Sequence, residues 1–125
     1  MMLAQEVVEK GGSVILDATF SRQHQRDEVI RLARDLYANI IFIECTASYQ
    51  MLKKRLTERE KRAGISDARL RHLKQLKAHF EPLGELQNDM HLKINTEESP
   101  DACMRQILSH DYIFLTQQTA KAMKN

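Results

Sequence analysis

Tryptophan is absent from this sequence of 125 residues, and glycine, proline and cysteine are scarce, with four, two and two residues. Internal repeats and low-complexity linkers are also absent, which favours one globular domain. The two cysteines, Cys45 and Cys103, have no Cys-x-x-Cys spacing. We therefore expect both to be reduced, buried thiols in a cytoplasmic protein.

Long apolar runs are missing as well. No stretch approaches the roughly 20 apolar residues that a membrane-spanning helix needs, and residues 1–3 lead directly into acidic and basic residues rather than into the apolar part of a signal peptide. We expect no association with a membrane. The formal net charge is only +2 and the sequence pI about 8.6, below that of a dedicated nucleic-acid-binding domain. The five histidines form no H-x-x-x-H pair, so they do not indicate a metal site.

A short apolar run that ends in a carboxylate and a hydroxyl occupies residues 13–19. Such a run is typical of a buried parallel strand, which delivers polar groups to the carboxyl edge of an α/β sheet, where ligands bind. We therefore expect Asp17 and Thr19 at that edge. The chemistry of the residues alone leaves open a structural alternative, in which Asp17 caps a turn together with Thr19.

The rest of the chain predicts helices that alternate with strands, which favours right-handed βαβ units and an α/β fold. Further strands are predicted at 40–45 and 91–96, and helices at 3–10, 22–37, 49–62, 66–80 and 99–109. The helices at 49–62 and 66–80 form a predicted helical hairpin. Residues 111–125 could extend the last helix or form an apolar anchor.

Basic residues are concentrated in this hairpin: Lys53, Lys54, Arg55, Arg59, Lys61, Arg62, Arg69, Arg71, Lys74 and Lys77. Arg55 and Arg59 are four positions apart, so they share a helix face and could converge on one polyphosphate. The alternative is a solvated helix face on which Glu58 and Glu60 balance the charge.

Residues 14–20, Val-Ile-Leu-Asp-Ala-Thr-Phe, together with Arg26, resemble the second core strand of small P-loop kinases of the polynucleotide-kinase and zeta-toxin type. Within that group the sequence is most similar to ATP-binding AAA domains that are often fused to aminoglycoside-phosphotransferase-like domains. The resemblance extends from about Leu3 to about Leu108. It implies a three-layer, P-loop NTPase-like parallel sheet, incomplete with about three strands, and a helical lid over residues 49–81.

The resemblance also implies roles for three residues after the predicted strand. Asp17 would accept the proton of the attacking hydroxyl or organise the shell of a magnesium ion. Thr19 would assist near the metal or the substrate, and Arg26 would point back at the same edge. A helix-surface arginine that is merely solvated is the alternative for Arg26.

The resemblance implies that four further residues contact the nucleotide. Arg55 and Arg59 would close over the ATP phosphates as lid cations. Asn95 and Thr96 fall where related kinases run a loop past the adenine, although both residue types are also common turn formers.

The phosphate-binding motif G-x-x-x-x-G-K-[ST] of these kinases is missing, because none of the four glycines precedes Lys-Ser or Lys-Thr. Residues 1–125 are therefore predicted to be a single C-terminal fragment of a P-loop kinase domain. The complete domain would use ATP and Mg2+ to phosphorylate a hydroxyl of a small molecule or nucleotide, and the isolated chain would be inactive.

The missing phosphate-loop strand would leave apolar strand edges exposed. Direct pairing of the neighbouring strands, a homodimer, or a missing N-terminal segment could cover them, and we favour a homodimer for the isolated chain. The alternative function is a non-catalytic interaction module, derived from a split or degenerate kinase, that binds an acidic partner or nucleic acid through its basic hairpin.

Overall fold

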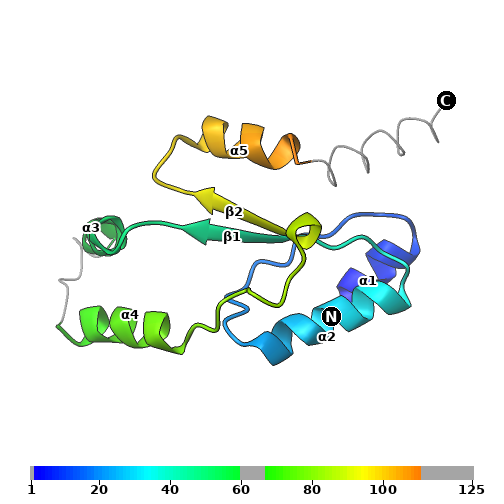
Figure 1. The fold of residues 1–125 in the computed structure, drawn as a ribbon, viewed down its shortest axis with the longest axis horizontal. Helices are drawn as coiled ribbons and strands as arrows, with labels where there is room; N and C mark the ends of the chain where they lie inside the picture. Colours follow the sequence, from blue (N-terminus) through cyan, green and yellow to red (C-terminus); the bar gives the residue numbers. More distant parts are fainter. Residues whose placement is uncertain (1, 60–66, 111–125) are drawn as a thin grey trace. The chain divides into compact units, whose positions relative to one another are not determined.

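The structure is a computed structural model that describes residues 2–59 and 67–110. Its elements, in chain order, are α1 (Met2–Glu9), α2 (Gln23–Asp35), β1 (Phe42–Thr46), α3 (Tyr49–Arg59), α4 (Asp67–His79), a 3-10 turn η1 (Asn88–Met90), β2 (His91–Asn95) and α5 (Pro100–Leu108) (Figure 1). Each helix in the described part is too short or too polar to cross a bilayer. The predictions for residues 60–66 and 111–125 fall outside the described residues.

The chain divides into two compact units, and each is described here by itself. The first unit contains Met1–Ile40 and His79–Glu85, and the second contains Ile41–Ala78 and Leu86–Asn125.

In the first unit, α1 ends at a two-glycine cap, as predicted. Gly11 has φ +82, a left-handed conformation that glycine adopts without steric cost. The Gly11 N–H donates to the Val8 carbonyl and the Gly12 N–H to the Val7 carbonyl, both at 2.9 Å. These two hydrogen bonds form a Schellman motif, which satisfies the last carbonyls of the helix.

The strand predicted over residues 13–19 is not formed. The sheet of the described residues has two strands, β1 and β2, and this segment pairs with neither. Its apolar side chains are not buried, since Val14 is 36% exposed, Ile15 94% and Leu16 38%. An apolar run becomes a strand only where a neighbouring strand completes its hydrogen-bond ladder, and that ladder is absent here.

Helix α2 is built around a buried arginine. An apolar stripe of this helix, formed by Val29, Ile30, Ala33 and Leu36, is half-buried. Arg26 lies on the same stripe, three and four positions before its first members, and its exposed fraction is 0%. The backbone of the segment 79–85 joins this part of the unit, because the Glu81 N–H donates to the Ser21 carbonyl at 2.8 Å.

The second unit contains the sheet. β1 and β2 are parallel and in register from the pair Phe42 and His91 to the pair Thr46 and Asn95. Helix α5 packs against β2, and Ile94 of β2 is 1% exposed. The α/β fold with an incomplete parallel sheet is confirmed, although two strands are formed in the described residues instead of about three.

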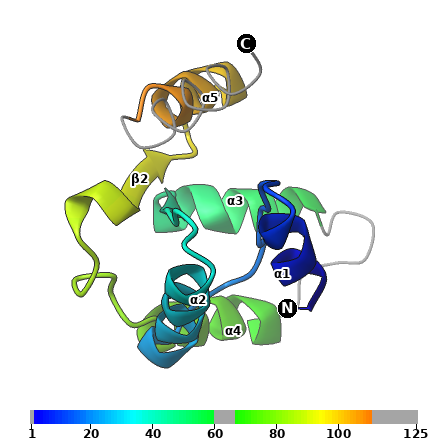
Figure 2. The same ribbon diagram turned by 90° about the vertical axis from the view of Figure 1, so that its right-hand side faces the viewer.

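Serine hydroxyls cap two helices of this unit. The Ser48 hydroxyl accepts a hydrogen bond from the Met51 N–H at 3.2 Å, at the start of α3. The Ser99 hydroxyl accepts one from the Ala102 N–H at 3.2 Å, and Pro100 opens α5. Figure 2 shows α3 and α4, the helices of the predicted hairpin, beside each other.

The prediction for the cysteines is half correct. Both Cys45 and Cys103 are free thiols, as expected. Cys45 is exposed and Cys103 is half-buried, so the expectation that both are buried is wrong. The reason is that α5 covers β2 rather than β1, which leaves the Cys45 side chain open to solvent.

Candidate functional site

The carboxyl ends of β1 and β2 form a polar edge in the second unit. Thr46 and Asn95 are the last register pair, and both strands end there. The chain continues from β1 through Ser48 into α3, and from β2 through a turn into α5. Because ligands of α/β proteins bind beyond the carboxyl ends of parallel strands, this edge is the candidate site.

Arg55 of α3 reaches this edge and is held there. Its Nη1 donates to Thr96 Oγ1 at 2.8 Å, and its Nη2 donates to the Thr96 carbonyl. Thr96 is in turn fixed to β1, since its N–H and its hydroxyl both donate to the Thr46 carbonyl, at 2.8 and 2.9 Å. The structure thus brings together two residues that were predicted separately, Arg55 and Thr96.

The Arg55 guanidinium keeps donors for a ligand. Two of its N–H groups are used by Thr96, and a guanidinium carries more than these. The side chain is exposed. An arginine that is anchored on one side and open on the other is suited to bind an anion without further ordering.

Arg59 ends α3 one turn beyond Arg55 and shares its face. Its side chain is exposed, and no hydrogen bond or ion pair joins it to another residue of the described ranges. Arg59 therefore offers a second cation on the same helix, and the described residues do not anchor it.

Asn95 forms the turn after β2. Its Oδ1 accepts from the Glu97 N–H at 3.0 Å, and its carbonyl accepts from the Glu98 N–H at 3.3 Å. This geometry matches the turn-forming alternative noted from the sequence. The role of Asn95 in contacting a base stays a prediction.

Sequence reasoning missed Glu97. Its carboxylate accepts from both the Ser48 N–H and the Ser48 hydroxyl, each at 3.1 Å, and so closes the start of α3. The negative charge there complements the helix dipole. The sequence offers Thr46 or Ser48 as the cap but cannot indicate which distant carboxylate joins it.

In the first unit, Asp17 and Thr19 lie in the irregular segment after α1 and are exposed. The Asp17 carboxylate makes no hydrogen bond or ion pair within the described part of the chain. No group of three metal-ligating side chains is found among the described residues. A single open carboxylate nevertheless fits Mg2+, which proteins often hold through one or two carboxylates together with substrate phosphates.

Arg26 is placed differently from the prediction. Its guanidinium is buried, and each nitrogen has a partner: Nε donates to Glu85 Oε1 at 2.7 Å, Nη1 to the Phe20 carbonyl at 2.7 Å, and Nη2 to the Pro82 carbonyl at 3.1 Å. Its Cζ also lies 6.0 Å from the centroid of the Phe80 ring. The structure therefore gives Arg26 a connecting role within the first unit, and its predicted role at a catalytic edge stays untested.

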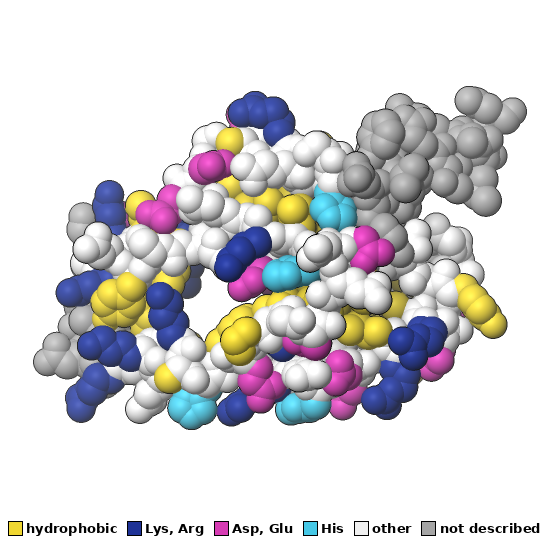
Figure 3. Space-filling view, in the orientation of Figure 1, with side chains coloured by type: hydrophobic (Ala, Val, Ile, Leu, Met, Phe, Trp, Pro, Cys, Tyr) yellow, Lys and Arg dark blue, Asp and Glu magenta, His cyan; other side chains and the backbone are white. Residues whose placement is uncertain are grey.

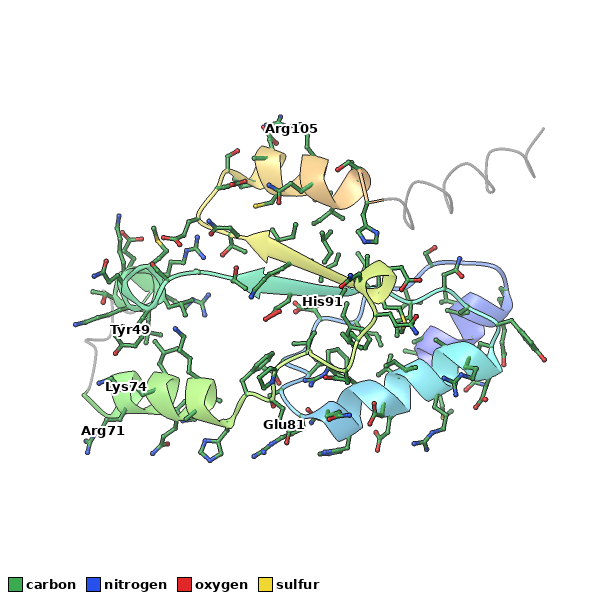
Figure 4. The ribbon with its side chains drawn as sticks, viewed as in Figure 1. Tyr49, Arg71, Lys74, Glu81, His91 and Arg105 are labelled. Atoms are coloured by element: carbon green, nitrogen blue, oxygen red, sulfur yellow. The ribbon has the colours of Figure 1, made fainter. Side chains whose placement is uncertain are left out.

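Glu81 closes the start of α2, as Figure 4 shows. Its carboxylate accepts from the Gln23 N–H and from Arg22 Nη1. The hydrogen bond from the Gln23 backbone, more than the Arg22 guanidinium, lowers the pKa of Glu81 below its ordinary value of 4.5.

The predicted site residues thus fall into two sets. Asp17, Thr19 and Arg26 belong to the first unit, and the second unit holds the other four: Arg55, Arg59, Asn95 and Thr96. Within the second set, Arg55 and Thr96 are in direct contact.

Comparison with known proteins identifies the family. No curated protein and no solved structure matches this chain. A family model described as an AAA domain matches residues 2–83, which is more than half of the chain. The matched residues include Asp17, Arg26 and the whole of α3 and α4. The chain therefore belongs to the P-loop kinase-like AAA family that occurs in polynucleotide-kinase and zeta-toxin-like proteins.

Proposed function

We propose that this chain is part of a cytoplasmic, ATP- and Mg2+-dependent kinase that transfers the γ-phosphoryl group to a hydroxyl of a small molecule or nucleotide. The observation that carries the proposal is the Arg55 guanidinium, fixed by Thr96 at the carboxyl edge of two parallel strands. This is the edge at which α/β folds bind phosphorylated ligands. The membership in a P-loop kinase-like family gives the same class of ligand.

Arg55 and Arg59 act on the phosphates in this proposal. Phosphoryl transfer demands positioning and neutralisation of charge more than covalent chemistry. Arg55 is already oriented by its contacts with Thr96, so it pays little entropy on binding a phosphate. Arg59 follows from the next turn of α3 and adds a second positive charge.

Asp17 supplies the carboxylate. It accepts the proton of the attacking hydroxyl, or it holds water molecules around the Mg2+ that bridges the phosphates. Its exposure and its lack of a partner within the described residues leave the carboxylate open for either task. Thr19 assists from the same segment, and the amide nitrogen of Asn95 and the Thr96 backbone contact the base.

The phosphate-binding loop is the missing part of the machinery. The 125 residues contain no G-x-x-x-x-G-K-[ST] motif, and the backbone N–H groups and lysine of that motif hold the phosphates in P-loop proteins. We infer that turnover needs this loop from an additional segment, and that the 125 residues alone bind nucleotide weakly with negligible turnover.

A nucleotide titration tests the proposal on the chain as it exists. The dissociation constant of a fluorescent ATP analogue with Mg2+ is measured for the wild type, for Arg59→Gln and for Arg105→Gln. Arg105 is an exposed arginine of α5 and serves as the matched control. We expect Arg59→Gln to weaken binding about tenfold, the effect of losing one charge-assisted hydrogen bond.

The proposal fails if Arg59→Gln and Arg105→Gln have the same affinity as the wild type. It fails equally if the analogue does not bind at millimolar concentration. Circular dichroism of both variants checks that the helices are intact.

A further inference from the structure

Positive charge is concentrated on α3 and α4. The basic side chains described there are Lys53, Lys54, Arg55, Arg59, Arg71, Lys74 and Lys77, which we call the basic surface. Glu58 is the one acidic residue among positions 49–59 and 71–79. Since the whole chain carries only +2, the charge is strongly segregated, and Figure 3 shows Lys and Arg side chains gathered over these two helices.

An aromatic ring lies within this surface. Tyr49, the first residue of α3, has Lys74 Nζ 5.9 Å and Lys77 Nζ 5.5 Å from its ring centroid. Both lysines are exposed and the ring is half-buried. Figure 4 shows Tyr49 and Lys74 facing each other between α3 and α4. The two helices thus present a ring and two ammonium groups as one cluster.

The surface is longer than one nucleotide requires. α3 has 11 residues and α4 has 13, so they extend about 16 and 20 Å at 1.5 Å per residue. This length exceeds the span of three linked phosphates and lets the surface run beside several successive phosphates of a nucleic-acid strand. Arg55 and Arg59 are sufficient to bind the phosphates of one triphosphate. The proposed kinase reaction therefore assigns no role to the basic side chains of α4.

We propose that the basic surface binds single-stranded nucleic acid. The lysines and arginines contact successive phosphates, and Tyr49 stacks on an unpaired base. The aromatic ring favours nucleic acid over an acidic protein partner, because carboxylates gain nothing from stacking. This inference goes beyond the proposed phosphoryl transfer and does not depend on it.

Fluorescence anisotropy with a labelled 12-nucleotide single strand tests the inference. We compare the wild type with the double variant Lys74→Gln/Lys77→Gln and with the control Arg31→Gln/Arg34→Gln. The control removes the same charge from exposed positions of α2. We expect the Lys74/Lys77 variant to bind about tenfold more weakly, and the slope of log K against log salt to fall by about 1.4, or 0.7 per phosphate contact.

The Tyr49 ring is tested by a pair of variants that preserve an apolar side chain. Tyr49→Phe keeps the ring and should bind as the wild type does, whereas Tyr49→Leu should lose roughly fivefold or more in affinity. The proposal is overturned if the lysine variant and the control variant lose the same affinity, or if Tyr49→Phe and Tyr49→Leu bind equally well. It is also overturned if the wild type does not bind the strand at low salt. Displacement of the strand by polyglutamate at equal charge concentration would also overturn it, in favour of an acidic protein partner.

Discussion

Arg26 illustrates at the scale of the residue how a long-range contact escapes local sequence patterns. The sequence offered a catalytic edge or a solvated helix surface for this arginine, and the structure buries it instead. Its partners were not visible. Glu85 and Pro82 lie more than fifty positions further along the chain, and no local pattern connects them to α2.

Replacement of Arg26 should be severely destabilising. In Arg26→Met the Glu85 carboxylate, whose side chain is 19% exposed, loses the Arg26 guanidinium, and the Phe20 and Pro82 carbonyls lose the hydrogen bonds that Arg26 donates. Breaking a buried ion pair in this way costs about 3–5 kcal/mol. Urea unfolding measures the change, with Arg34→Met on the same helix as the exposed control. If Arg26→Met lowers the free energy of unfolding as little as Arg34→Met does, Arg26 does not connect α2 to the segment 79–85.

Glu81 predicts a pH dependence of stability. The pKa of Glu81 is lowered in the folded state, so its carboxylate contributes stability that is present above the unfolded pKa and is lost as the pH falls through the folded value. The difference in Tm between wild type and Glu81→Gln should therefore be present at pH 7, shrink as the pH falls past the ordinary pKa of a glutamate, and vanish once the pH is below the lowered pKa of the folded state.

Glu28→Gln is the control for this measurement, because it removes the same charge from an exposed position of α2 without touching the cap. A Glu81→Gln difference that persists unchanged at low pH would show that the cap does not depend on ionisation.

At the scale of the element, the sequence predicts best those features that a few neighbouring residues determine. Ser48 and Ser99 start helices, and the pair Gly11 and Gly12 ends one, because caps depend on a few neighbouring residues. The prediction of a strand at 13–19 was wrong, because a strand needs a neighbouring strand to hydrogen-bond with, and the segment itself cannot specify that neighbour. For the same reason the sequence predicted β1 and β2 as strands but did not give their register.

The glycine cap predicts the stability of α1. A Cβ at Gly11 meets no atom within 4 Å, but its φ of +82 is unfavourable for alanine, which costs about 1 kcal/mol. We expect Gly11→Ala to lower the amide-exchange protection of α1 about fivefold. Gly84→Ala has open space and no positive φ, so it should leave α1 unchanged. If the amides of α1 are equally protected from exchange in Gly11→Ala and Gly84→Ala, the glycine cap does not stabilise α1.

At the scale of the whole molecule, the family was predictable because its motif is contiguous. Residues 14–20 and Arg26 carried the resemblance, and the family match over 2–83 includes them. The sequence did not predict which apolar side chains are buried, because burial depends on which surfaces of the chain pack against each other. Leu83 and Ile94 are the buried apolar residues among those described, while Ile15 and Ile43 remain exposed.

These exposed apolar residues predict self-association. Ile15 is 94% and Ile43 39% exposed, and β1 has a strand on one edge only within the described sheet. Exposed apolar segments and open strand edges each tend to pair with another chain. Light scattering should give a mass above 14.5 kDa, and Ile15→Lys should shift it towards the monomer. A monodisperse wild-type monomer would contradict this prediction.

The claim on which the account depends is that the edge formed by β1, β2 and Arg55 receives the phosphates of a nucleotide. An NMR titration of the labelled chain with Mg2+-ATP tests it most directly, by recording which backbone amides shift. The account predicts the largest changes at Ser48, Arg55 and Thr96. Saturating ATP that leaves these three amides unchanged, or that shifts only residues outside this edge, would contradict it.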